Sequence, residues 1–172
     1  SDHKVSEALY LNDVEGNGIE IYYDRSPDQR NWQNGDVEMT VDPLDIESLV
    51  ASADQTVWSG MPVGTVMGHI HLRVANLVEA ETFYVQGLGF DIVNRYGTQA
   101  IFISSNGYHH HIALNIWGRP NAIERNENTL GLKSYSIVYP SKEEREKVVS
   151  QLEIIGATVS VQSDYVCAID PS

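Results

Sequence analysis

Residues 68–90 read GHIHLRVANLVEAETFYVQGLGF, and this stretch decides the fold because its apolar period changes within a few residues. From Gly68 to Val74 apolar and polar residues alternate, which predicts a strand. Asn76 is a typical residue for the N-terminal cap of a helix. The apolar residues that follow recur at the spacing of one helix face: Leu77, Ala80, Phe83, Tyr84 and Leu88. Gly87 or Gly89 closes the helix, so the stretch predicts a strand that leads directly into a helix.

The sequence after residue 90 predicts a repeated unit. Three strand candidates come next, at residues 90–96, 100–104 and 109–117, before a loop at 118–130. A second series follows, with a strand at 135–139, a helix that begins with the capping sequence Ser141-Lys142-Glu143-Glu144, and strands at 158–161 and 165–169. The order is β-α-β-β-β and then β-α-β-β, which indicates one supersecondary unit repeated with its last strand missing.

The N-terminal stretch resembles the end of such a unit. A strand at 5–11 and a strand at 19–23 flank Asn17-Gly18, a strong hairpin signal. Three segments are therefore predicted: residues 1–24 as the C-terminal hairpin of an upstream βαβββ module, 25–66 as a linker, and 67–172 as a domain of two βαβββ units. The linker contains a short helix near 45–53, and the stretch through Trp58, Gly60 and Pro62 is expected to pack through a few anchors. On this interpretation the chain is a fragment.

Composition narrows the possible partners and locations. The chain has 172 residues, of which 42% are hydrophobic and 20% charged, with a formal net charge of −13. This acidic balance argues against binding to nucleic acid or to an anionic membrane. No apolar run is long enough for a transmembrane helix. The single cysteine excludes an intrachain disulfide, and a cytoplasmic location is the default expectation.

Three phrases carry a resemblance to a known superfamily. They are residues 68–90, NGYHHHIALNIW at 106–117 and SEALYLNDVEGNGIEIYYDR at 6–25. Together they resemble the vicinal-oxygen-chelate (glyoxalase/bleomycin-resistance/extradiol dioxygenase) superfamily, and in particular its Bacillus-type catechol 2,3-dioxygenases. The resemblance implies an α+β fold in which repeated βαβββ modules form a curved mixed sheet around a cup-shaped site, with helices on the outer face. It also implies extradiol cleavage of catechol or a similar aromatic diol by O2 and a non-haem Fe(II), with Mn(II) as an alternative metal.

Two metal ligands are predicted. His69 and His71 lie two apart and therefore face the same way on a strand. The superfamily places its ligand five residues before the valine that ends this strand, which implies His69, since Val74 ends it. Glu20 is implied as the carboxylate ligand by its position after Asp13-Val14-Glu15-Gly16-Asn17-Gly18, where the family usually has proline in place of valine. Hydrogen-bonded strand histidines and a solvent-facing glutamate are the plainer alternatives.

Further site residues follow from the same resemblance. His3 is implied as the acid and base, and Tyr10, ten residues before Glu20, as a hydrogen-bond donor to the substrate. His71, His109 and His111 are candidates for contacting the substrate. The alternatives are a frayed terminal His3, a core Tyr10, and strand histidines bonded to a neighbouring loop.

The third metal ligand is not found where the repeat predicts it, because residues 134–139 contain no histidine. A histidine of an upstream module is the expected third ligand, and His109 or His111 is the alternative. The isolated chain is therefore expected to be weakly active or inactive. Two other functions stay open, namely a glyoxalase-like metal-dependent isomerase or transferase and a non-enzymatic small-molecule-binding protein. An unfinished sheet has an open edge, so a homo-oligomer is also expected.

Overall fold

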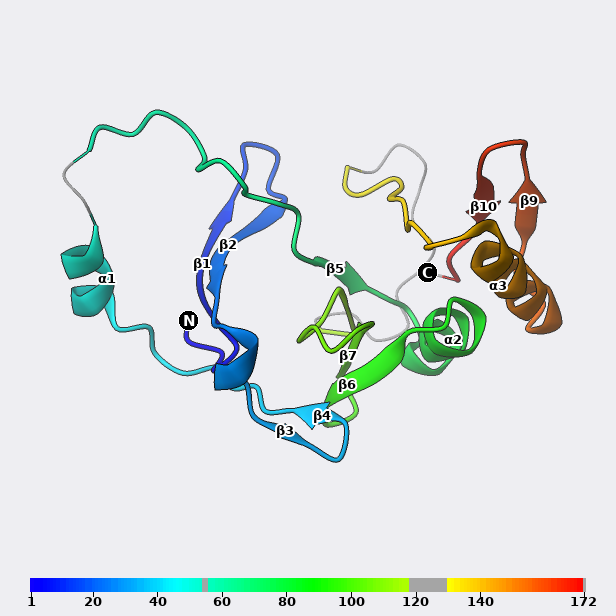
Figure 1. The fold of residues 1–172 in the computed structure, drawn as a ribbon, viewed down its shortest axis with the longest axis horizontal. Helices are drawn as coiled ribbons and strands as arrows, with labels where there is room; N and C mark the ends of the chain where they lie inside the picture. The colour runs from blue at the N-terminus through cyan, green and yellow to red at the C-terminus, as the bar shows by residue number, and fades with distance from the viewer. Residues whose placement is uncertain (54–55, 118–129, 172) are drawn as a thin grey trace. The chain divides into compact units, whose positions relative to one another are not determined.

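A computed structural model describes residues 1–53, 56–117 and 130–171. The chain divides into two compact units, Ser1–His69 and Ile70–Ser172, which are coloured blue to green and green to red in Figure 1. Within the described residues, no helix combines the length and apolar character that crossing a membrane requires.

The second unit opens with the predicted βαβββ order. Its elements are β5 (Ile70–Arg73), α2 (Leu77–Glu81), β6 (Asp91–Tyr96), β7 (Ala100–Ser104) and β8 (Ile112–Asn115). The four strands form one sheet in the order β5-β8-β7-β6. β5 pairs parallel with β8, and the other neighbours are antiparallel. This mixed sheet with its helical crossover confirms the predicted α+β class.

The predicted helix forms, but it changes type along its length. The Asn76 side chain accepts hydrogen bonds from the backbone N–H groups of Val78 and Glu79, which confirms the predicted cap. After α2 the backbone continues as a π-helical segment, Thr82–Gly87, and the N–H of Leu88 donates to the carbonyl of Phe83 at 2.9 Å. A Cβ at Gly87 would lie 2.8 Å from side-chain carbons of Leu152 and Ile155, so this glycine allows close packing against the α3 region.

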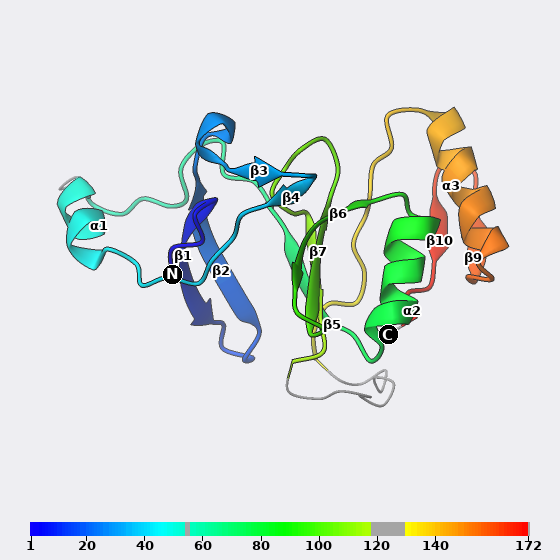
Figure 2. The same cartoon turned by 90° about the horizontal axis from the view of Figure 1, so that it is seen from below.

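Helix α3 (Lys142–Ile154) is followed by a two-stranded hairpin, β9 (Val159–Val161) and β10 (Val166–Ala168). The Ser141 hydroxyl accepts from the N–H of Glu144, as the capping sequence predicts. Gly156, at φ 78°, ends the helix region as expected. Figure 2 shows α2 and α3 next to each other, and Figure 1 shows the β9–β10 hairpin beside α3.

The structure corrects two strand predictions. β8 begins at Ile112, so His109, His110 and His111 precede the strand, and strand alternation does not set where their side chains point. Residues 135–139 are not a strand, because they have no ladder partner within the part of the chain that the structure describes. The loop predicted at 118–130 lies, apart from Leu130, outside the described residues.

The core of the second unit contains fully buried aliphatic side chains on adjacent strands. Ile103 on β7 and Leu114 on β8 are both 0% exposed. We expect Leu114→Ala to lower the free energy of unfolding by about 2–5 kcal/mol, because it removes buried methyl groups and leaves a cavity. Urea unfolding followed by circular dichroism measures this change.

Val138→Ala is the control, since that side chain is 91% exposed. Its effect is expected to stay within about 0.5 kcal/mol. Equal losses for Leu114→Ala and Val138→Ala would contradict the assignment of this core.

The first unit is built on the predicted hairpin, β1 (Ser6–Asn12) and β2 (Gly18–Asp24). The carboxylate of Asp13 closes the turn by accepting from the backbone N–H groups of Glu15 and Asn17. The remaining elements of this unit are short: a 3-10 turn at Pro27–Gln29, β3 (Trp32–Gln33), β4 (Asp36–Val37) and α1 (Ile46–Ser52). Trp58 is 72% exposed, so it is not one of the anchors expected in this stretch.

Candidate functional site

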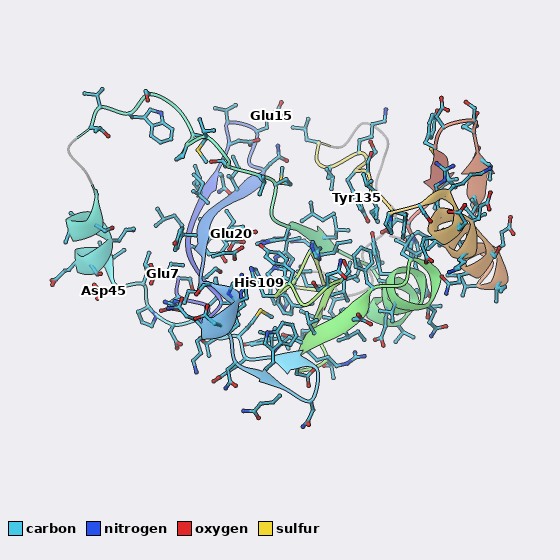
Figure 3. All side chains as sticks on the ribbon, viewed as in Figure 1. Glu7, Glu15, Glu20, Asp45, His109 and Tyr135 are labelled. Atoms are coloured by element: carbon cyan, nitrogen blue, oxygen red, sulfur yellow. The ribbon has the colours of Figure 1, made fainter. Side chains whose placement is uncertain are left out.

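One face of the β1–β2 hairpin carries the polar residues Tyr10 and Glu20, and the other face is aliphatic. Glu20 is largely shielded on its face, whereas Tyr10 is 59% exposed. In the antiparallel register Tyr10 lies opposite Glu20 and Ala8 opposite Tyr22. Because side chains alternate along strands, these four residues share one face. The other face is apolar but between 41% and 46% exposed at Leu9, Leu11, Ile19 and Ile21. Figure 3 shows Glu20 on β2, between Glu15 at the turn and Glu7 toward the opposite end.

Four side chains of the first unit form a continuous hydrogen-bonded series, which we call the relay: His3, Tyr10, Glu20 and His69. Nε2 of His3 lies 2.7 Å from the hydroxyl oxygen of Tyr10, and that hydroxyl lies 2.9 Å from Oε1 of Glu20. Oε2 of Glu20 lies 2.8 Å from Nε2 of His69. The side chains of Glu20 and His69 are 16% and 6% exposed. The structure therefore brings Glu20 and His69 together, although 49 residues separate them.

The carbonyl of Thr40 determines where His3 carries a proton. Its oxygen lies 2.6 Å from Nδ1 of His3. A carbonyl can only accept, so Nδ1 of His3 must donate. The hydroxyl of Tyr10 has one hydrogen, which it gives to Glu20 when that carboxylate is ionised. Every hydrogen bond in the relay is then made when Nε2 of His3 also carries a proton.

The electrostatics of the relay favour an ionised Glu20. Burial by itself raises the pKa of Glu20, but the hydrogen bonds from His69 and Tyr10 and the charge of His69 outweigh it, so the pKa lies below its usual value. Desolvation and the neighbouring Glu20 carboxylate raise the pKa of Tyr10. Tyr10 therefore stays a neutral hydroxyl that can pass a proton between its two partners.

A cluster of backbone and ionic contacts holds the segment that carries His3. The guanidinium of Arg25 donates to both carboxylate oxygens of Asp2, at 2.7 and 2.8 Å, and also to Glu7. The backbones of Asp2 and Asp42 exchange two hydrogen bonds, and the N–H of Thr40 donates to the carbonyl of His3. His3 is thus not frayed, because the residues before and after it are fixed.

The Asp2–Arg25 pair predicts a change in acid stability. The hydrogen bonds from Arg25 lower the pKa of Asp2 to about 2, from 3.8 for the unperturbed group. The pair therefore stabilises the fold fully above pH 3.8, and this contribution is lost as the pH falls from 3.8 toward 2. The free energy of unfolding falls between pH 5 and pH 2.5, and we expect Arg25→Gln to make this fall smaller by about 1 kcal/mol. This value allows for the screening of a partly exposed ion pair by solvent.

Urea unfolding at the two pH values tests this expectation. Lys147→Gln is the control, since Lys147 pairs with Glu144 on the exposed surface of α3. An Arg25→Gln variant with the acid sensitivity of the unmodified protein would show that the pair contributes nothing in solution.

The histidines predicted to contact the substrate belong to the second unit. His71 is exposed, with its ring centroid 5.3 Å from that of Trp117. His109 is 0% exposed, and its Nδ1 lies 2.8 Å from Nδ1 of His110. Nδ1 of His111 lies 3.0 Å from the hydroxyl of Ser104, and burial lowers the pKa of His111. Contact of His71, His109 and His111 with a substrate stays a prediction.

The donor types of Glu20 and His69 suit a divalent metal. One carboxylate oxygen and one imidazole nitrogen lie side by side, both largely shielded from water, and are close enough for one cation to bind both. Such donors bind Fe(II), Mn(II) and Zn(II). Within the described residues no group of three or more His, Cys, Asp or Glu is arranged to hold a metal. Metal binding by Glu20 and His69 stays a prediction.

Sequence reasoning missed the residues that support the relay. Thr40 contributes only a backbone carbonyl, so its side-chain type carries no signal. Arg25 was included in the hairpin phrase, but its pairing with Asp2 spans 23 residues and has no periodic signature. Tyr22, whose ring stacks on His69, has a usable signal, because it lies two residues from Glu20 and so shares its face.

Comparison with known proteins gives one family and one close relative. A family model described as "Glyoxalase/Bleomycin resistance protein/Dioxygenase superfamily" matches residues 66–164. A protein of Bacillus subtilis (strain 168) named catechol-2,3-dioxygenase is 44% identical over 174 residues, covering 99% of this chain and 60% of the relative. The chain thus spans 60% of the length of that relative.

Two crystal structures are similar over 64% of this chain, each at 18% identity. One is lactoylglutathione lyase from Agrobacterium tumefaciens, with 89% of that chain covered and a TM-score of 0.46. The other is a glyoxalase/bleomycin resistance protein/dioxygenase from Alicyclobacillus acidocaldarius, with 87% covered and a TM-score of 0.44.

Proposed function

Since this chain belongs to the glyoxalase/bleomycin resistance protein/dioxygenase superfamily, we propose that it acts in extradiol ring cleavage of catechol or a similar aromatic diol by O2. The relative named catechol-2,3-dioxygenase, at 44% identity, supports this activity. The observation that carries the proposal is the convergence of Glu20 and His69 at 2.8 Å, with Tyr10 and His3 continuing the same series of hydrogen bonds.

Glu20 and His69 would hold a divalent iron. When bound, iron would supply the redox chemistry that couples an aromatic diol to dioxygen. Manganese is a tolerable alternative, whereas zinc binds the same donors without redox chemistry. Binding requires a deprotonated Nε2 on His69, so the proton that His69 now shares with Glu20 leaves when the metal enters.

Tyr10 and His3 would move a proton away from the diol. With Glu20 engaged by the metal, and with His3 neutral and its single proton on Nδ1, the hydroxyl of Tyr10 can donate to Nε2 of His3 instead. A substrate hydroxyl that gives its proton to Tyr10 then drives the Tyr10 proton onto that nitrogen. The Thr40 carbonyl at Nδ1 stabilises the resulting imidazolium. Imidazole is the side chain best matched to proton transfer near neutral pH.

The proposal is tested by reconstituting the protein with Fe(II) without oxygen and then supplying catechol and O2. We expect oxygen uptake and a yellow ring-cleavage product with Fe(II) and neither with Zn(II). A low rate is expected, because no group of three or more His, Cys, Asp or Glu is arranged to hold a metal within the described residues.

Three other results would overturn the proposal. Isomerase or thiol-transferase turnover with Ni(II) or Zn(II) and no oxygen uptake would assign the protein to a non-redox class. Binding of an aromatic ligand without any metal binding would identify a small-molecule-binding protein. Absence of product together with full retention of Fe(II) would show that the site holds metal for another purpose.

A further inference from the structure

Tyr22 lies against the imidazole that the proposed function assigns to the metal. The two rings are stacked, with centroids 4.9 Å apart and planes 28° from parallel. Tyr22 follows Glu20 by two residues on β2, so both side chains leave the same face of the hairpin. Its cross-strand neighbour is Ala8, a small side chain that leaves room for the tyrosine ring.

The backbone next to His69 leaves no room for a side chain. A Cβ at Gly68 would overlap the hydroxyl of Tyr22 and would lie 2.5 Å from its Cζ and 3.0 Å from its Cε1. Real Cβ atoms essentially never approach other atoms that closely. A Cβ at Gly18, by contrast, would meet nothing within 4 Å. Gly68 therefore permits a close approach that any other residue would disturb.

Two of the contacts of His69 constrain the orientation of its imidazole. The hydrogen bond to Glu20 fixes one atom, Nε2, and still allows the ring to turn about the line through that bond. The stacked ring of Tyr22 fixes the plane of the imidazole. An imidazole that is held at one atom and in its plane keeps Nε2 directed toward the metal position. The side chain then loses less conformational entropy when the metal binds.

We propose that Tyr22 is a positioning residue for His69 and that glycine at position 68 lets the Tyr22 ring keep its place against the imidazole, because the ring occupies the space of a Cβ. This inference rests on the proposed function, since it takes His69 as a metal ligand. In this role Tyr22 is not itself a metal ligand. Its contribution is made through the orientation of His69.

The first test replaces Tyr22 with leucine and uses Tyr23→Leu as the matched control. Tyr23 is the next residue, faces the opposite side of the hairpin and is 78% exposed. In the metal-free protein, the ring protons of His69 are expected to lose the ring-current shift that a stacked aromatic produces, and Tyr23→Leu is expected to preserve it. This NMR readout requires no metal and no activity.

The second readout is Mn(II) binding, followed by the loss of the free-ion electron paramagnetic resonance signal. Tyr22→Leu is expected to weaken binding by about 10- to 100-fold, the range typical of residues that orient a metal ligand. Tyr23→Leu is expected to leave binding unchanged. Tyr22→Phe keeps the ring and is expected to restore both the NMR shift and the affinity.

The requirement at position 68 is tested with Gly68→Ala, with Gly18→Ala as its control. Gly68→Ala is expected to push the Tyr22 ring away from His69 and to reproduce the effects of Tyr22→Leu. The double variant Gly68→Ala/Tyr22→Leu is expected to bind Mn(II) no more weakly than Tyr22→Leu alone, because both substitutions remove the same contact. Gly18→Ala is expected to change neither readout.

The inference and the proposed function fail in different ways. If His69→Ala abolishes Mn(II) binding while Tyr22→Leu changes neither the His69 resonances nor the affinity, the positioning role is wrong and the ligand assignment holds. If His69→Ala leaves Mn(II) binding intact, the ligand assignment is wrong. A Tyr22→Phe variant as weak as Tyr22→Leu would also contradict positioning by the ring.

Discussion

Replacing Glu20 with alanine is expected to lower the affinity for Fe(II) by more than the roughly 10- to 100-fold loss typical of residues that only support a ligand. The substitution removes one of the two donors that the structure brings together, and it leaves the shielded imidazole of His69 without its carboxylate. The rate of ring cleavage should fall in proportion to the loss of bound metal. Isothermal titration with Fe(II) under anaerobic conditions, together with oxygen uptake, measures both effects.

Glu15→Ala is the matched control for this prediction. Glu15 is an exposed glutamate at the turn of the same hairpin (Figure 3), and the hydrogen bond at that position is made by its backbone N–H. Its loss should change neither metal affinity nor turnover. Normal iron binding by a folded Glu20→Ala variant would remove Glu20 from the proposed site.

Tyr10→Phe is expected to lower kcat by about 100- to 10,000-fold, the usual contribution of proton transfer by a positioned side chain. The substitution removes the one hydroxyl that joins His3 to Glu20. It leaves the Glu20–His69 contact in place, so metal affinity should change little. The expected result is therefore a loss in kcat with metal content preserved, measured on enzyme reconstituted with Fe(II).

His3→Gln is expected to have an effect of similar size, and the double variant should be little worse than either single one. Residues that act as a unit in proton transfer give strongly non-additive effects. Tyr23→Phe is the control, since Tyr23 is exposed and lies on the opposite face of β2. Independent, multiplicative losses from Tyr10→Phe and His3→Gln would show that the two side chains do not share one proton path.

The βαβββ order could be predicted because its signals are local. The alternation before Val74 and the helical spacing after Asn76 are determined by neighbours a few residues apart, and the structure places β5 and α2 there. The π-helical segment could not be predicted, because Gly87 adopts it while packing against Leu152 and Ile155, more than 60 residues along the chain. The strand predicted at 135–139 failed for the corresponding reason, since a strand also needs a partner.

The site was only partly predictable. The resemblance identified His3, Tyr10, Glu20 and His69, and the structure joins all four by hydrogen bonds. Alternation alone favoured a solvent-facing Glu20, because its neighbours Ile19 and Ile21 are apolar. The hairpin instead exposes those neighbours and shields the carboxylate. The carbonyl of Thr40 accepts the hydrogen bond from Nδ1 of His3. Every residue has a backbone carbonyl, so the residue type at position 40 could not reveal this contact, and only the structure shows it.

The relay is contained in Ser1–His69, whereas the large aliphatic cluster lies in Ile70–Ser172. Random mutagenesis should therefore sort its inactive variants by position. Substitutions in Ile70–Ser172 would chiefly reduce the yield of folded protein. Substitutions in Ser1–His69 would more often give protein that folds but has no activity. A variant library can be screened both for the amount of folded protein and for the yellow ring-cleavage product. The substitutions that reduce folding and those that reduce only product formation should then fall in different parts of the sequence.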